Sequence, residues 1–522
     1  MNLITSQGSP HMPKSLNQIM HGKSASTFLT FMSIIIFVCF VAISVGMVFS
    51  NGVCCGDDAY FAVVAKNLAN GLGYSSSFYG STSYTLQPFD TGISTGPTII
   101  LPASLIIKLF GNTYWAPGLT IVTIWSTLLV MIGKLIIKQV PSHKNFLAMV
   151  FVFFFYCLTF FPYHFEHWYS LLGEVPSALF IILGILVYFD KSTKGNLLLT
   201  GLLFSLAVQS KQIALLPFIT FIVFVNLKEL IFYKYSIVNF FQSFIQSSFF
   251  IFLGFIAPIF LFEIWRYISL GFNGYLNYWL EFFSFFVDKG VGGTTQSWEL
   301  ITSRIGLLKT RFGISLPIII IFLSLIFFEI RKDKKIQKIY SVIFAIVIVY
   351  SIYWIYFSIG WARYYIICLI LIIFCFIFPL FLKNTCKKIS LVYLIVLVTV
   401  SIINFRNLNV TSAFQGISLF TRTTSSASSE IMVDLLSTQL DKKPFITQWW
   451  ATAADLEYLL PSYLNFTTYH DQTFNFDKPF VVVVDTRLVA PDEDFEKLLK
   501  WCKTYEVNRY IYGLCEPIKM NN

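Results

Sequence analysis

Long apolar runs alternate with short polar segments over residues 28–405. A helix needs about 20 consecutive apolar residues to cross a bilayer, and many of these runs approach that length. The first run predicts a retained span over residues 28–49, preceded by a polar cytoplasmic segment over residues 1–27. The other runs predict spans at residues 117–137, 145–162, 174–190, 196–209, 212–227, 246–265, 313–329, 339–357, 364–382 and 389–405.

The apolar run over residues 97–110 is shorter than the roughly 20 residues of an ordinary span. It contains Pro97, Pro102 and Lys108, which favours a re-entrant or interfacial segment. The outer loop before it, residues 50–96, is poor in Lys and Arg, whereas residues 134–144 are basic, so an odd number of crossings separates them. The pattern predicts about eleven transmembrane helices, or about 12 to 13 if re-entrant or short segments also cross, with the C-terminus outside.

The stretch over residues 51–74 follows the first predicted span and begins with two adjacent carboxylates, Asp57 and Asp58. Helical spacing of its apolar residues predicts a helix on the bilayer surface that starts at these acids and ends at Gly71 or Gly73. From spacing alone, two readings of the acids are equally good: an N-cap on a solvated loop, or a functional pair. The apolar face consists of Phe61, Val64, Ala65, Leu68 and Leu72.

Composition excludes an ordinary soluble protein. Among 522 residues, 56% are hydrophobic and only 12% are charged, against about 25% charged in a typical soluble domain. The net charge of +10 comes from Lys and Arg in short loops between apolar runs. Basic loops of this kind encode membrane topology, so the charge does not indicate a nucleic-acid partner.

Ionisable side chains gather in the segments that this topology places outside or at the membrane edge. Glu174, Lys211 and Arg363 border apolar runs, where ionisable groups are costly and suggest function. Lys211 and Arg363 have the alternative of reaching to lipid head groups. His167 has no cysteine or third histidine near it, so an interfacial role is more typical than a zinc site. The same face contains Asp57, Asp58, Asp90 and Glu166.

A long outer loop is expected over residues 266–312, and it is rich in aromatic residues. An aromatic belt at the membrane interface is the ordinary explanation. The glycine-rich run at residues 290–293 suggests the alternative that this loop folds over a lipid substrate.

The composition changes after the last predicted span. Residues 406–522 contain strand-like runs at 444–448, 480–485 and 508–513, which alternate with helix-like runs at 451–460 and 492–505. This pattern predicts a small extracytoplasmic α/β domain without a Gly-rich phosphate loop. Cys502 and Cys515 lie in it and can pair if it is extracytoplasmic.

The carboxylates and cations of the predicted outer face suit a reaction in which a phosphate is the leaving group. A carboxylate can deprotonate an attacking hydroxyl, and cations can stabilise a departing phosphate. Such parts are needed to move a sugar from a polyprenyl phosphate to an acceptor outside the cytoplasm. Adjacent carboxylates also suit Mg²⁺ or Mn²⁺, so Asp57 and Asp58 form a candidate metal site.

The motif order resembles the GT-C superfamily of integral-membrane glycosyltransferases, which includes protein O-mannosyltransferases, the aminoarabinose transferase of lipid A and O-antigen glucosyltransferases. The resemblance covers most of residues 28–382. It implies a lipid-phosphate sugar donor, a hexosyl or pentosyl transfer with inversion, and catalysis on the outer face. The motifs that carry it are GDDAYF, DTGISTGPTIILPASLIIKLFG, GEVPSALFIILGILVYF and QSKQIALLPF.

Position by position, the resemblance makes Asp57 the base and Asp58 its partner in positioning a substrate. Lys211, after Ser210, is similar to a donor-binding lysine of the family, and Arg363 to an arginine near the lipid phosphate. Glu174 is similar to an acid that contacts the sugar; Asp90, Glu166 and His167 are further candidates for binding sugar or acceptor. The chain has Phe89, Asp90 and Thr91 where the aminoarabinose transferase has Glu-Lys-Pro, which leaves the donor sugar open.

Two other classes remain as alternatives. A transporter or flippase of lipid-linked sugars also needs charges among many spans, but no clear internal repeat is found. An O-antigen ligase or polymerase would place its charges in a mid-chain loop, whereas here the acidic pair is early. The expected setting is a bacterial inner membrane, with a glycan, lipid or protein as acceptor in cell-envelope, lipopolysaccharide or O-antigen synthesis.

Overall fold

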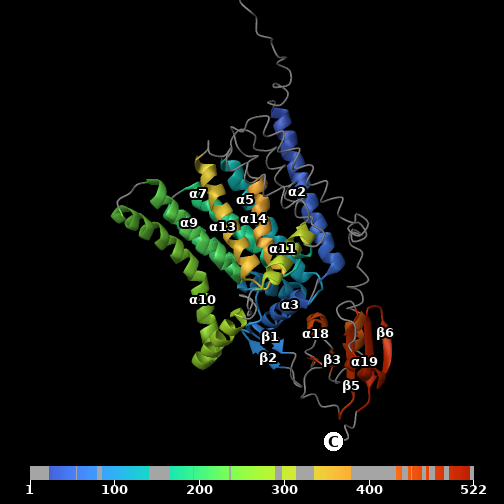
Figure 1. Cartoon of the computed structure of the whole chain (residues 1–522). Helices are drawn as coiled ribbons and strands as arrows, with labels where there is room; N and C mark the ends of the chain where they lie inside the picture. Colours follow the sequence, from blue (N-terminus) through green and yellow to red (C-terminus); the bar gives the residue numbers. More distant parts are fainter. Residues whose placement is uncertain are drawn as a thin grey trace, which may run out of the picture.

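The computed structural model of the chain describes a helical bundle with a C-terminal sheet (Figure 1). The described residues are 23–53, 56–78, 85–139, 165–191, 193–233, 237–287, 297–312, 334–377, 431–437, 445–447, 450–460, 466–468, 477–486 and 493–517.

The bundle is built from helices that coincide with predicted spans. Three of them are long and apolar enough to cross a membrane, over Ala116–Ile136, Ser248–Phe285 and Gln337–Tyr356, and a bent pair formed by α2 and α3 gives up to four. The predicted spans at 145–162, 313–329 and 389–405 lie outside the described residues, so the total of about eleven stays a prediction. The bundle helices are α2 (Lys23–Asn51), α5 (Ala116–Gln139), α7 (Glu174–Asp190), α8 (Lys194–Ser210), α9 (Leu215–Tyr233), α10 (Ile237–Phe285), α13 (Lys334–Tyr356) and α14 (Ile366–Ile377).

Two segments differ in kind from the long bundle helices. α4 (Pro97–Phe110) is a 14-residue helix with Pro102 inside it. At 1.5 Å per residue it extends about 21 Å, less than the roughly 30 Å hydrocarbon core. The region expected as a loop over 266–312 is helical where it is described: α10 continues to Phe285 after a break at Gly271, and α11 covers Trp298–Phe312. Residues 290–293 lie outside the described residues.

The helix predicted after the first span is present as α3 (Gly56–Ala69), and the chain turns by 89° between α2 and α3. It begins at Gly56, so Asp57 and Asp58 occupy its first turn, and Gly71 follows it with a left-handed φ of 80°. The expectation of a single apolar face towards the bilayer is wrong. Every residue from Phe61 to Asn67 is buried, including Lys66.

The hairpin β1 (Ser75–Phe78) and β2 (Thr85–Pro88) follows α3. The C-terminal region holds a five-stranded sheet in the order β4-β3-β5-β7-β6, in which β4, β3 and β5 are parallel and the other two strands are antiparallel. Its elements are β3 (Phe445–Thr447), α18 (Trp450–Leu459), β4 (Phe466–Thr468), β5 (Phe480–Asp485), α19 (Glu493–Lys500), β6 (Cys502–Val507) and β7 (Tyr510–Cys515).

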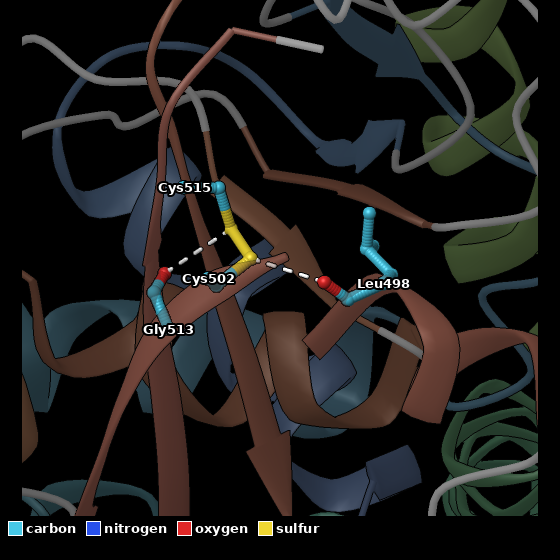
Figure 2. The surroundings of a disulfide bond; sticks show 4 residues. All are labelled: Leu498, Cys502, Gly513 and Cys515. Atoms are coloured by element: carbon cyan, nitrogen blue, oxygen red, sulfur yellow. Dashed lines mark hydrogen bonds between the residues drawn. A yellow bond between two sulfur atoms is a disulfide. The ribbon is translucent and has the colours of Figure 1, made fainter. Parts of the chain in front are cut away.

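The helix predicted over residues 492–505 is therefore wrong beyond Lys500. β6 occupies 502–507 because it pairs with β7, and Cys502 lies opposite Cys515 in that register. A disulfide joins these two cysteines (Figure 2), as the sequence suggested. Elsewhere in the sheet, Arg509 contacts Asp455 at 2.6 Å and Asp485 at 3.3 Å. Burial opposes the charge of Arg509, but these neighbours and Tyr510 outweigh it and raise the pKa of the guanidinium.

The C-terminal region packs directly on α3 through α18. Gly56 leaves so little space that a Cβ there would lie 2.5 Å from the Cβ of Ala451. Ala59 belongs to the same buried cluster as Leu456 of α18. The ring of Tyr60 meets Trp450 edge-on at 6.1 Å. α3 is therefore enclosed on the side that would otherwise face solvent.

α8 and α10 cross with their backbones in close contact. A Cβ on Gly201 would lie 1.9 Å from the carbonyl oxygen of Ile251, and a Cβ on Gly254 would lie 2.1 Å from that of Leu198. Small residues permit this approach, which is a common way to pack helices in a membrane. The crossing fixes α8, whose C-terminal end carries Lys211.

We expect Gly201→Ala to destabilise the bundle, because the added methyl group would overlap the backbone of α10. Overpacking of this kind costs about 1–3 kcal/mol, and the thermal unfolding midpoint of the detergent-solubilised protein is expected to fall accordingly. Gly133→Ala is the matched control, because Gly133 lies in α5 with no atom within 4 Å of a Cβ there. Equal midpoints for the two variants would contradict the proposed crossing.

Candidate active site

Lys211 lies where α8 ends and the short helix η2 (Gln212–Ala214) begins. Two loops close in on this point and each approaches through a glycine. A Cβ on Gly96 would lie 2.2 Å from the Gln209 carbonyl oxygen, and a Cβ on Gly173, whose φ is +83°, would lie 2.3 Å from that of Ser210. A side chain at either position would overlap a backbone carbonyl oxygen, so both sites require glycine. At Gly173 the left-handed φ also favours glycine.

The ammonium group of Lys211 is enclosed among polar and aromatic partners. Nζ lies 3.2 Å from Glu174 Oε1 and donates a hydrogen bond to Ser94 Oγ at 3.2 Å. It also lies 5.6 Å from the ring centre of Phe61 and 5.7 Å from that of Tyr364. The side chains of Lys211 and Glu174 are 3% and 0% exposed, so this ion pair is sealed from solvent.

Glu174 is the first residue of α7, directly after Gly173. A carboxylate in the first turn is favoured by the partial positive charge of a helix N-terminus. The helix N-terminus and Lys211 therefore both oppose the cost of burying this carboxylate.

Arg363 lies on η5 (Ala362–Tyr365), which joins α13 to α14. Its guanidinium forms an ion pair with Asp57 of α3 and lies over the rings of Trp361 and Tyr364, with Cζ 4.5 Å and 5.2 Å from their centres. The side chains of Arg363 and Asp57 are 18% and 31% exposed, so this second ion pair is accessible.

Arg304 of α11 contacts the segment between α13 and Arg363. Arg304 donates from Nη1 to the carbonyl oxygen of Ile355 at 2.7 Å, close to the C-terminal end of α13. A cation is favoured at that end of a helix. Gly360, with a φ of +76°, lets the loop pass over the Arg304 side chain.

The two predicted cations meet at one aromatic ring. Tyr364 lies within 6 Å of both Lys211 Nζ and Arg363 Cζ. Because Glu174 contacts Lys211 and Asp57 contacts Arg363, four of the predicted site residues form one cluster. Two cations face two carboxylates there.

Asp58 is oriented differently from Asp57. It is 1% exposed, and Oδ1 accepts a hydrogen bond from the backbone N–H of Leu171 at 2.6 Å. This contact ties the start of α3 to the segment before Gly173. Asp58 therefore supports the position of Asp57, and its predicted part in positioning a substrate stays a prediction.

Asp90 has its carboxylate occupied within the first outer loop. It accepts hydrogen bonds from Tyr60, from Ser76 at 2.6 Å and from the backbone N–H of Gly92 at 2.9 Å. These contacts fix the conformation of the loop in which Ser94 accepts its hydrogen bond from Lys211. A role in binding sugar or acceptor remains a prediction.

Glu166 and His167 lie on the short helix η1 (Phe165–Trp168). His167 is buried, and the side chain of Glu166 lies outside the described residues. Their predicted sugar or acceptor contacts also stay predictions.

The acidic pair does not present a set of metal ligands. Asp57 faces the guanidinium of Arg363, and Asp58 accepts a backbone N–H. Among the residues that the structure describes, no group of three or more His, Cys, Asp and Glu side chains is arranged to hold a metal ion. We derive no step through Mg²⁺ or Mn²⁺.

Sequence reasoning missed Ser94 and Tyr364, which complete the surroundings of Lys211. Ser94 lies in the motif DTGISTGPTIILPASLIIKLFG, and Tyr364 directly follows Arg363. With 27 tyrosines in the chain, no sequence signal separates Tyr364 from the others.

No protein-family model matches this chain, and no curated protein sequence matches it. Among solved structures, ArnT from Cupriavidus metallidurans bound to undecaprenyl phosphate matches with a TM-score of 0.57 and 10% identity, over 93% of this chain and 98% of that one. ArnT in the apo state gives 0.56 and 10% identity, over 92% and 97%. The present chain shares its overall fold with these ArnT structures.

Another solved structure superposes less closely. The archaeal oligosaccharyltransferase AglB from Archaeoglobus fulgidus, in complex with an inhibitory peptide and a dolichol-phosphate, gives a TM-score of 0.47 and 9% identity, over 94% of this chain and 75% of that one. At such identities the likeness concerns the fold alone. The roles of individual side chains depend on the contacts described above.

Lys66 connects α3 to the C-terminal region. Its Nζ donates to the carbonyl oxygens of Glu457 at 2.5 Å and Leu460 at 2.7 Å, at the C-terminal end of α18. Ser77 of β1 donates to the carboxylate of the same Glu457. Tyr458 donates to the carbonyl oxygen of Thr113 at 2.8 Å. These bonds brace the helix that carries Asp57.

We expect Lys66→Met to loosen this brace, because it leaves two buried carbonyl oxygens without their donor. An unmade hydrogen bond of this kind costs about 1–3 kcal/mol. Hydrogen exchange in α3 and α18 is expected to accelerate relative to the bundle. The control is Lys194→Met, which removes an exposed lysine at the start of α8. Unchanged exchange in Lys66→Met would show that the brace does not depend on this lysine.

Proposed function

We propose that this chain transfers a sugar from a polyprenyl-phosphate-linked donor to a hydroxyl of a glycan, lipid or protein acceptor on the extracytoplasmic side of a membrane. The observation that carries the proposal is the cluster of Asp57, Glu174, Lys211 and Arg363 at the end of an apolar helical bundle. The GT-C fold supports it at the level of architecture.

The donor phosphate is assigned to the cations. Arg363 is accessible, and a guanidinium offers planar, bidentate donors that match phosphate. Lys211 lies on the buried side of the cluster, where it shares the Tyr364 ring with Arg363, and it adds positive electrostatic potential there. As the glycosidic carbon–oxygen bond breaks, negative charge grows on the departing phosphate, and fixed cations stabilise it.

Asp57 is assigned as the general base. Its carboxylate is 31% exposed, whereas that of Asp58 is buried against Leu171, so Asp57 is the member of the pair that an acceptor can reach. The acceptor hydroxyl gives its proton to Asp57, and its oxygen attacks the sugar carbon. The lipid phosphate leaves with the bonding electron pair from the opposite face, which inverts that carbon.

Two features support an extracytoplasmic site. The positive-inside pattern favours an acidic loop on the outside, and the Cys502–Cys515 disulfide suits an oxidising compartment. α18 belongs to the region with the disulfide and packs on α3, so the site and the disulfide share one side.

We expect Asp57→Asn to abolish sugar transfer, because the amide cannot accept the acceptor proton. General-base catalysis is worth about 10²–10⁴-fold, and a loss within that range is expected. The measurement is transfer in membranes from a panel of radiolabelled polyprenyl-phosphate sugars. The control is Asp477→Asn, which alters an exposed aspartate of the C-terminal region. Full transfer by Asp57→Asn would remove it as the base, and no transfer by the wild type from any donor would favour a flippase.

We expect Cys502 and Cys515 to resist maleimide labelling in the wild type until a reductant is added, because they form a disulfide. In Cys515→Ser, the freed Cys502 is expected to react with a membrane-impermeant maleimide in right-side-out vesicles and not in inverted ones. The double variant with both cysteines replaced by serine measures the background from the other cysteines. Labelling only in inverted vesicles would place the C-terminal region in the cytoplasm.

A further inference from the structure

The two ion pairs of the site differ in what a ligand can do to them. The Lys211–Glu174 pair is enclosed, with side chains 3% and 0% exposed. The Arg363–Asp57 pair has side chains 18% and 31% exposed. A phosphate that enters the site therefore meets Arg363 first, and Arg363 is already neutralised by the residue assigned as the base.

The guanidinium of Arg363 keeps donors for a second anion. Nη1 serves Asp57, while Nε is buried and has no hydrogen-bond partner among the described residues. The guanidinium also lies beside the neighbouring rings of Trp361 and Tyr364, and these contacts do not use its N–H groups. An arriving phosphate can therefore bind the same guanidinium and compete with the carboxylate for it.

The reaction geometry requires that this competition be resolved. In an inverting displacement, the base and the leaving phosphate lie on opposite faces of the sugar carbon. Asp57 and Arg363 touch in the ligand-free site, so they cannot remain in contact while one holds the acceptor proton and the other holds the phosphate.

We propose that Arg363 exchanges partners: the donor phosphate displaces Asp57 from Arg363 and thereby releases Asp57 to act as base. This inference rests on the proposed function. Before the donor binds, the ion pair occupies the Asp57 carboxylate and keeps it from an acceptor hydroxyl. After the exchange, the carboxylate is free for the acceptor hydroxyl, and Lys211 remains with Glu174. The donor consequently binds before a productive acceptor.

The exchange predicts that removing the carboxylate strengthens phosphate binding while it abolishes transfer. Asp57→Asn is expected to bind undecaprenyl phosphate about fivefold more tightly than the wild type, as for the loss of a competing, partly exposed ion pair worth up to about 1 kcal/mol. The measurement is a titration of the detergent-solubilised protein with undecaprenyl phosphate, with thermal unfolding as a check of folding.

Two comparisons separate the exchange from a general effect of charge. Asp477→Asn removes an exposed carboxylate of the C-terminal region, outside the cluster of the site, and is expected to leave the affinity unchanged. In an Arg363→Gln background, Asp57→Asn is expected to give no gain, so the double-mutant cycle isolates the pair.

The outcomes are distinct. Equal or weaker binding by folded Asp57→Asn, or an equal gain in the Arg363→Gln background, would overturn the exchange while leaving the transferase proposal intact if the wild type transfers sugar. A wild type that neither binds undecaprenyl phosphate nor transfers sugar would overturn the proposed function and the exchange together.

Discussion

Ionised side chains at the end of an apolar helical bundle have to be paired, because neither lipid nor a dry interior solvates them. In this chain Lys211 is paired with Glu174 and Arg363 with Asp57. The first pair is sealed and holds the Ser94 loop, α7 and α8 at one point. The second pair is accessible. The same physical requirement thus gives one pair that supports the site and another that a phosphate can open.

α3 is the element on which both parts of the molecule depend. Its Phe61 lies against Lys211 of the bundle, while Ala59 is part of the buried cluster of the C-terminal region. Lys66 bonds the end of α18, and Gly56 leaves room for Ala451. The C-terminal region therefore takes part in holding the candidate base. In Figure 1, α3 lies beside β1, between the bundle and α18.

Local patterns were informative wherever the physical cause is local. Apolar length located α5, α7 and α13, and the 3.6-residue period located α3. The cost of ionisable groups at the membrane edge singled out Glu174, Lys211 and Arg363. The same reasoning failed at residues 502–505, which were expected to be helical. Pairing with β7 decides their conformation, and no local pattern contains that partner.

The sequence alone determined that this is a membrane protein with acids early in the chain, cations later, and a C-terminal region of mixed strands and helices. Only the tertiary structure decided which carboxylate meets which cation. Asp57 and Arg363 are 306 positions apart, and their contact depends on how α3 and η5 are packed. It also decided that most of α3 is buried, because its outward face is covered by α18, a helix nearly 400 positions later in the chain.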